Sequence, residues 1–309
     1  MKPSALAVVA AIAVSGCGVA NAAPTTQTPA TTVASTTTAS STTTSTTTST
    51  TTLPPETLPP ESTTTEAITT TTASPFARPA WLGTRPLPLG PDGKTAIPQP
   101  TPPELQNRQF ETIDFLAPPP DDRFVSTIGP IPNEVLARST WSEDCPVTLD
   151  DLSYVTVSFY GFEGDVHTGE LIVNASVADD IVSVFHTLFN AKFPIEEMRV
   201  TSQDDLDAAP TGDGNDTGSF VCRPTVGSDY WSQHAYGLAV DIDPFQNPYV
   251  KGDVIIPELA GSYTDRDQVR PGMILDGDVV TQAFTDIGWT WGGTWHTLKD
   301  RMHFSQNGS

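Results

Sequence analysis

The first 120 residues of the chain are too poor in apolar side chains to build a packed core. Residues 25–75 are mostly Thr and Ser, with Pro and Ala, and residues 76–120 are rich in Pro. Such a composition cannot offset the entropy that is lost when a backbone becomes ordered. We therefore predict a disordered stalk over residues 24–121 and one globular domain over residues 122–309, which is long enough to bury a single core.

The N-terminus has the pattern of an export signal. It reads MKPSALAVVAAIAVSGCGVANAAP, in which one Lys precedes an apolar run that is too short to span a bilayer. Two cleavage sites compete. The segment VSGC resembles a bacterial lipobox and would leave Cys17 as the lipidated first residue, whereas ANA at residues 20–22 is an ordinary signal-peptidase site. We favour the lipobox within a signal peptide at residues 1–23, which predicts an exported protein, anchored to the membrane or associated with the cell wall.

Charge and cysteine content narrow the possible partners and the redox environment. The formal net charge is -22, and no basic run follows Lys2. Nucleic acid is therefore not an expected partner, because phosphate binding needs clusters of Lys and Arg. In an exported chain the remaining cysteines, Cys145 and Cys222, are expected to form a disulfide; the alternative is two buried thiols. Their wide spacing is unfavourable for a structural zinc site. We expect a monomer.

From residue 140 onward the sequence predicts regular structure. Apolar and β-branched residues at 154–162 and 169–176 predict a β-hairpin. A helical period follows over residues 177–190, and a second one lies within DVVTQAFTDIGW at residues 278–289. Short strands are expected at residues 238–242 and 302–305. Strands and helices are mixed without a repeating βαβ order, which predicts a compact α+β domain.

Two short segments combine residue types that bind zinc. In SQHAYGLAVDID, His234 and Asp241 flank Gly237, which lets the chain bend so that both side chains can face one point. In KDRMHF, His303 lies on an apolar strand and Asp300 precedes it by three residues. Two imidazoles and one carboxylate suit a catalytic zinc ion that keeps one position open. A further carboxylate that does not bind the metal can serve as the base.

These segments together resemble the zinc D-alanyl-D-alanine carboxypeptidase family. That family includes VanY-type carboxypeptidases, phage endolysin peptidases and L-alanyl-D-glutamate endopeptidases. The resemblance extends to FVCRP before the first segment and NPYV after it, and covers residues 125–309. It implies a compact fold like that of Hedgehog and DD-peptidase domains. The matching patterns are S-x-H-x-x-G-x-A-x-D (Ser232, His234, Gly237, Ala239, Asp241) and D-x-x-H-F (Asp300, His303, Phe304).

The resemblance also implies roles for individual residues. His234, Asp241 and His303 would bind zinc, and Asp300 would take a proton from water and later protonate the leaving amine. Arg223 would hold a carbonyl or carboxylate of the substrate, for which a guanidinium is well shaped. Further expectations concern the surroundings. Ser232 orients the first ligand or binds substrate, unless it is a turn hydroxyl. Asp243 is a rival carboxylate that is expected to support the ligands rather than bind the metal. His296 is expected to contact a ligand or face the substrate, with metal binding as the less favoured alternative.

The implied substrates are the stem peptides of peptidoglycan. The expected reaction is removal of a terminal D-Ala from D-alanyl-D-alanine by a zinc peptidase. Cleavage between L-Ala and D-Glu is the alternative enzyme reaction. A non-catalytic wall-binding module with a structural zinc, and a stalked adhesin, are the alternatives without chemistry.

Overall fold

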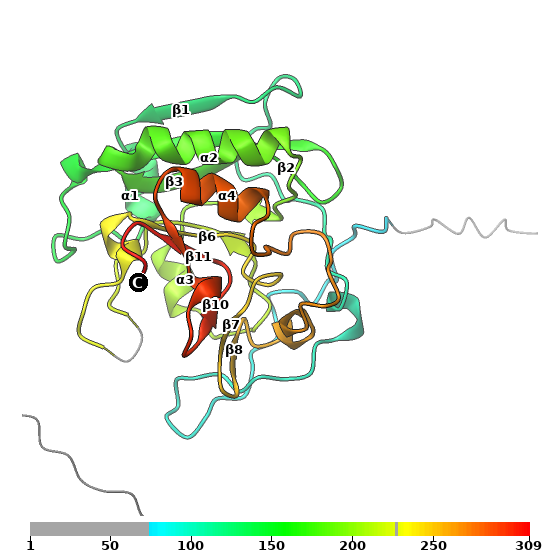
Figure 1. Cartoon of the computed structure of the whole chain (residues 1–309). Helices are drawn as coiled ribbons and strands as arrows, with labels where there is room; N and C mark the ends of the chain where they lie inside the picture. The colour runs from blue at the N-terminus through cyan, green and yellow to red at the C-terminus, as the bar shows by residue number, and fades with distance from the viewer. Residues whose placement is uncertain (1–73, 226–227) are drawn as a thin grey trace, which may run out of the picture. The chain divides into compact units, whose positions relative to one another are not determined.

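The computed structural model describes residues 74–225 and 228–309 (Figure 1). The predicted signal peptide, with Cys17, and residues 24–73 of the predicted stalk lie outside the described residues. Within them, no helix combines the length and the apolar character needed to cross a membrane.

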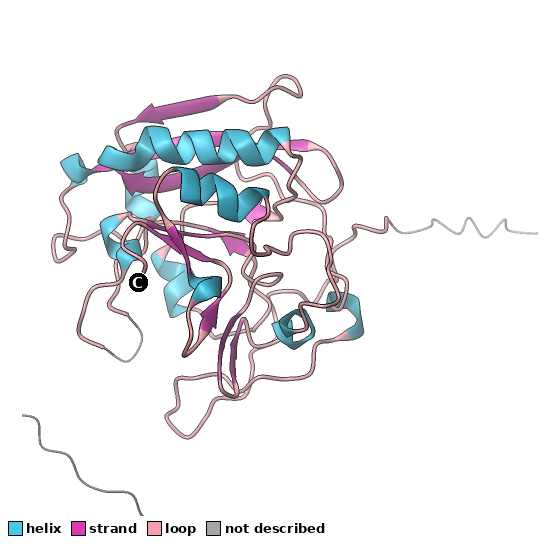
Figure 2. Ribbon diagram, viewed as in Figure 1, coloured by secondary structure: helices cyan, strands magenta, loops and turns pink. Residues whose placement is uncertain are grey.

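Short helices and short strands alternate irregularly along the chain (Figure 2). The α+β prediction is therefore confirmed. The helices are α1 (Asn133–Arg138), α2 (Ala178–Asn190), α3 (Gln203–Asp207) and α4 (Val279–Asp286). The strands are β1 (Ser126–Gly129), β2 (Leu152–Tyr160), β3 (Val166–Asn174), β4 (Glu197–Met198), β5 (Asp216–Thr217), β6 (Ala239–Asp241), β7 (Tyr249–Lys251), β8 (Val254–Ile256), β9 (Thr290–Trp291), β10 (Lys299–Asp300) and β11 (His303–Ser305).

The predicted hairpin and first helix form the main core. β2 and β3 pair antiparallel along their whole length, and β1 adds to the edge of β2. α2 lies across this sheet (Figure 1). Its buried residues Ile181, Val184, Phe185 and Leu188 recur at the spacing of one helix face and join the largest apolar cluster. This confirms the helical period that the sequence shows.

A small second sheet completes the core and carries the candidate site. Its strand order is β6-β11-β9, and all its pairs are antiparallel. Phe304 of β11 is fully buried and stacks on Phe284 of α4 with ring centroids 4.0 Å apart. Both predicted elements around Phe304, the strand at 302–305 and the helix before it, are therefore present.

The predicted domain boundary at residue 122 is wrong. Residues 74–121, hereafter the arm, belong to the same compact unit as the rest of the domain. Leu105 and Phe110 of the arm are buried beside Phe245 and Tyr263 in a second apolar cluster. The arm holds apolar residues at irregular intervals between its prolines, so no helix or strand period reveals them. Proline also lowers the entropy that the arm loses on docking.

A buried ion pair fixes the arm to the domain. Arg108 and Glu196 are 1% and 0% exposed, and the guanidinium donates to both carboxylate oxygens, at 2.7 and 2.8 Å. Arg108 also donates to the Asp213 carbonyl oxygen, and Arg78 and Asn215 donate to the Glu196 carboxylate. A charge this deeply buried is tolerated only when it is paired and hydrogen-bonded. The arm is therefore an integral part of the fold.

A disulfide joins Cys145 to Cys222, with their Cα atoms 5.8 Å apart. It connects the segment after α1 to the segment that leads to Arg223 and His234. The chain between the two cysteines includes β2, β3 and α2, so the bond closes a loop around much of the core.

Candidate metal centre

His234 is held by a short helical turn with a capping residue at each end. The turn is a 3-10 helix, η4 (Gln233–Tyr236), and the Ser232 hydroxyl accepts the backbone N–H of His234 at 3.3 Å. Gly237 ends it with a φ of 66°, in the left-handed region that glycine adopts without strain. A Cβ on Gly237 would lie 2.5 Å from the backbone nitrogen of Asn174 on β3. Ser232 thus acts as a turn hydroxyl, and Gly237 allows the turn to pack against β3.

Strand pairing brings the other two predicted ligands together. In the antiparallel pair of β6 and β11, Asp241 is directly opposite His303. Side chains at directly opposed positions point to the same face of a sheet. The pairing therefore places the Asp241 carboxylate and the His303 imidazole side by side, although the two residues are 62 positions apart in the sequence.

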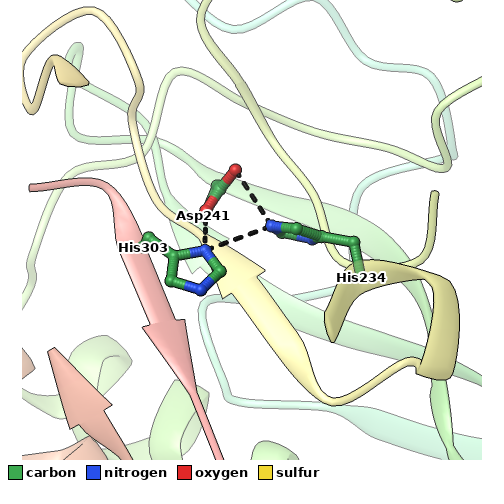
Figure 3. Close-up of side chains that lie close together, drawn as sticks. All are labelled: His234, Asp241 and His303. Atoms are coloured by element: carbon green, nitrogen blue, oxygen red, sulfur yellow. Dashed lines mark hydrogen bonds and ion pairs between the residues drawn. The ribbon is translucent and has the colours of Figure 1, made fainter. Parts of the chain in front are cut away.

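The three side chains converge within hydrogen-bonding distance of one another (Figure 3). His303 Nδ1 lies 3.0 Å from Asp241 Oδ1, His234 Nε2 lies 3.3 Å from Asp241 Oδ2, and the two imidazole nitrogens are 3.2 Å apart. Each residue offers one ligand atom, and these atoms all lie within 4.8 Å of one another. Both histidines are buried and Asp241 is partly buried. The donor set, two nitrogens and one carboxylate oxygen, is one that zinc accepts.

In each histidine, the ring nitrogen that faces away from the cluster is hydrogen-bonded, which fixes the position of the proton on the ring. His234 Nδ1 faces the Ser219 carbonyl oxygen, and His303 Nε2 faces an oxygen of Ser309 at 3.3 Å. An oxygen of this kind only accepts, so each of these ring nitrogens carries the proton, and the other nitrogen presents its lone pair to the centre. Two lone pairs 3.2 Å apart repel unless a cation lies between them. The geometry therefore fits a metal ion.

Before an ion binds, the electrostatics of the cluster favour an ionised Asp241 and a protonated His303, and a metal ion would displace the His303 proton. Burial acts to raise the pKa of Asp241, but the charges and hydrogen bonds of His234 and His303 outweigh it and hold this pKa well below its usual range. Burial lowers the pKa of His303, whereas the Asp241 hydrogen bond and the charges of Asp241 and Asp300 produce a net increase. Asp241 therefore stays ionised, as a metal-binding carboxylate must be.

Asp300 is a partly buried residue beside the cluster, and its carboxyl group does not belong to the ligand set. Its Oδ1 atom is buried without a hydrogen-bond partner in the described part of the chain. Burial, together with the negative charge of Asp241, raises the pKa of Asp300 to about 7, although His303 and Arg223 act in the opposite direction. The backbone of Gly292 approaches it closely, since a Cβ there would lie 3.0 Å from the Asp300 Cβ. A carboxyl group with a pKa near 7 can both accept and donate a proton at neutral pH.

A small pocket opens next to the cluster. It has a volume of about 70 Å³ and is lined by Thr201, Asp216, Gly218, Val221, Arg223, His234 and Asp241. Arg223 is partly exposed, and among the described residues its guanidinium donates to the Pro224 carbonyl oxygen alone, which leaves further N–H donors for a ligand. Asp216 was not predicted from the sequence, because the polar segment 203–219 shows no hydrophobic period.

The remaining candidates lie apart from the ligand cluster. Asp243 has a φ of 41°, follows the end of β6, and its carboxylate accepts the Glu196 N–H at 3.1 Å. It is therefore directed toward the arm anchor, in line with the expectation that it is no ligand. His296 is exposed and is absent from the cluster of potential ligands found among the described residues.

Residues 226–306 match the family model of D-alanyl-D-alanine carboxypeptidase. The match supports a peptidase of this family. The matched segment contains both histidines, Asp241 and Asp300, while Arg223 and Asp216 precede it. Searches among curated proteins and among solved structures gave no match.

Proposed function

We propose that this domain is a zinc-dependent peptidase that removes the terminal D-Ala from peptidoglycan stem peptides ending in D-alanyl-D-alanine. The observation that carries the proposal is the convergence of His234, Asp241 and His303 beside the buried, unpartnered Asp300 carboxylate oxygen. The family match adds support, because it spans all four residues. A wall-binding module would have no need of a buried carboxyl group whose charge is costly to maintain.

His234, Asp241 and His303 would hold the zinc ion. A zinc ion, when bound, polarises a substrate carbonyl group and makes a nearby water more acidic. The Asp300 carboxylate would accept the proton of the attacking water and later donate it to the nitrogen of the leaving D-Ala.

Arg223 would bind a carboxylate of the residue that leaves. Its guanidinium lines the pocket beside His234 and Asp241 and can bind a carboxylate through two parallel hydrogen bonds. A substrate that ends one residue beyond the scissile bond presents its terminal carboxylate close to the reacting carbonyl.

We further propose that the protein acts outside the cytoplasm. The N-terminal export pattern, with Cys17 as a lipid anchor point, would place the domain near the cell wall, and the Thr/Ser-rich segment would separate it from the membrane. Radiolabelled palmitate in the mature chain, lost in Cys17→Ser, would support the anchor. Full secretion of an unacylated chain would contradict it.

Metal analysis combined with product analysis tests the enzymatic proposal. We expect about one zinc per chain, release of single D-Ala from a stem pentapeptide, and loss of activity after chelation. Asp300→Asn should keep the zinc and lose turnover by on the order of 10²- to 10⁴-fold. His303→Ala should lose both, whereas the exposed control His296→Ala should keep both. Mass spectrometry distinguishes released D-Ala from cleavage between L-Ala and D-Glu. Full activity without metal would contradict the proposal.

A further inference from the structure

Asp216 lies on the face of its strand that lines the pocket of the proposed active site. The residues on either side of it in the sequence, Asn215 and Thr217, are buried, and they bond to Glu196 and to the backbone of Phe245 and Asp243. Side chains alternate along a strand, so Asp216 and Gly218 face the opposite way, into the pocket.

Gly218 places Asp216 close to the candidate metal ligands. Gly218 and Asp241 exchange two backbone hydrogen bonds, at 3.1 and 2.9 Å. A Cβ on Gly218 would meet Thr201 Oγ1 at 3.4 Å and Asp216 Oδ2 at 3.9 Å. The missing side chain thus leaves room beside the Asp216 carboxylate, within the pocket that Asp241 also lines.

The Asp216 carboxylate has no cationic partner among the described residues. Its Oδ1 atom accepts one backbone N–H, from Arg199 at 3.1 Å. The Arg199 guanidinium is bound instead to both oxygens of Asp205, at 2.7 and 3.0 Å. Burial raises the pKa of Asp216 well above its usual range, and the charge of Arg199 offsets only part of this effect. An ammonium group supplied by a ligand would offset the cost of this buried charge.

We propose that Asp216 binds a primary ammonium group of the substrate on the acyl side of the scissile bond. The inference rests on the proposed carboxypeptidase function. In an intact substrate the nitrogen of the terminal D-Ala is an uncharged amide, so any ammonium group must lie in the part that precedes the bond. Two sources share this chemistry: the α-amino group of a short peptide, and the side-chain amino group of a diamino acid in the stem.

Three matched peptides separate these sources. They are Lys-D-Ala-D-Ala acetylated at both amines, at the α-amine only, and at the side-chain amine only. We expect at least one mono-acetylated peptide to be cut with a kcat/KM roughly 10- to 100-fold above that of the diacetylated peptide, the range for a hydrogen bond between charged groups. The preferred peptide identifies which ammonium group Asp216 binds.

The variant Asp216→Asn keeps the acceptor for the Arg199 N–H and removes only the charge. It should reduce the preference, measured as the ratio of kcat/KM between the mono-acetylated and the diacetylated peptide, to less than about threefold, at the level expected of an exposed pair. The control Asp207→Asn removes an exposed carboxylate of α3 that accepts only from Gln203, and it should keep the full preference. A merely structural role for Asp216 would lower activity toward all three peptides equally.

Calorimetric titration of the same peptides into zinc-loaded Asp300→Asn, with and without Asp216→Asn, provides a readout that needs no turnover. If none of the peptides is cut, the proposed function fails, but a preference in Kd that disappears with Asp216→Asn still supports the ammonium site. Equal affinity for the three peptides, or a preference that survives Asp216→Asn, overturns the inference.

Discussion

Replacing Asp300 by Asn should make the metal-free protein more stable. The pKa of Asp300 rises from 3.8 to about 7, mainly because of burial. A carboxyl group whose pKa is raised by folding adds stability at pH values below its unfolded pKa, and that stability is lost as the pH rises through the folded pKa. At about 1.4 kcal/mol for each pKa unit, the raised pKa costs the folded state about 4 kcal/mol near pH 8, where the group is ionised, and about 2 kcal/mol near pH 5, where it takes up a proton on folding. Asn has a similar shape and carries no charge.

Urea unfolding in the presence of a chelator, followed by tryptophan fluorescence from about pH 5 to about pH 8, measures this effect. The stability gained by Asp300→Asn should grow with pH by about 2 kcal/mol over that range. The control Asp286→Asn changes an exposed carboxylate on α4 that accepts from Gln282, and it should stay within about 0.5 kcal/mol at every pH. A gain that does not depend on pH, or a loss of stability near pH 8, would refute the assignment of Asp300 as a buried group with a raised pKa.

Three further perturbations test the centre, the arm and the disulfide. Adding zinc at about 1,000 times its Kd to the metal-free protein should raise its free energy of unfolding by about 4 kcal/mol in the same assay. His303→Ala should abolish this stabilisation. Equal stabilisation of the variant would place the zinc elsewhere. Arg108→Met should lower the free energy of unfolding by about 3 kcal/mol, because it leaves Glu196 buried without its main partner. The control Arg123→Met, at an exposed residue, should lower it by less than about 1 kcal/mol. Equal losses would mean that this ion pair does not anchor the arm. Reduction of the Cys145–Cys222 bond should lower the stability by about 4 kcal/mol, as the loop-closure relation gives for a separation of 77 residues, and an unchanged unfolding midpoint would contradict this.

The sequence predicted the elements whose periodicity is strong and local. The hairpin of β2 and β3 and the helices α2 and α4 are long enough to show a clear period of apolar residues. The convergence of His234, Asp241 and His303 was predicted because residue chemistry and family resemblance could be read without knowing how the strands pair. The pairing itself could not be read, since β6 and β11 have only three residues each.

The arm and Asp216 show what the sequence could not provide. The apolar residues of the arm have no period, and its anchor Arg108 is an isolated charge whose partner lies 88 positions away. Asp216 lies in a polar segment that resembles any surface loop. The residues that flank Asp216 become buried where β5 pairs in parallel with β4. Nothing in the sequence of either segment predicts this pairing.

Core packing and the candidate centre depend on a single strand register. β11 places His303, Phe304 and Ser305 opposite Asp241, Val240 and Ala239. Phe304 is fully buried between β6 and α4, and alternation along the strand then directs His303 to the other face, where Asp241 lies. A slip by one residue would withdraw Phe304 from the core and turn His303 away from Asp241. The free energy of burying one aromatic side chain therefore also holds two of the three candidate ligands in position, so the centre is ordered by the fold before any ion arrives.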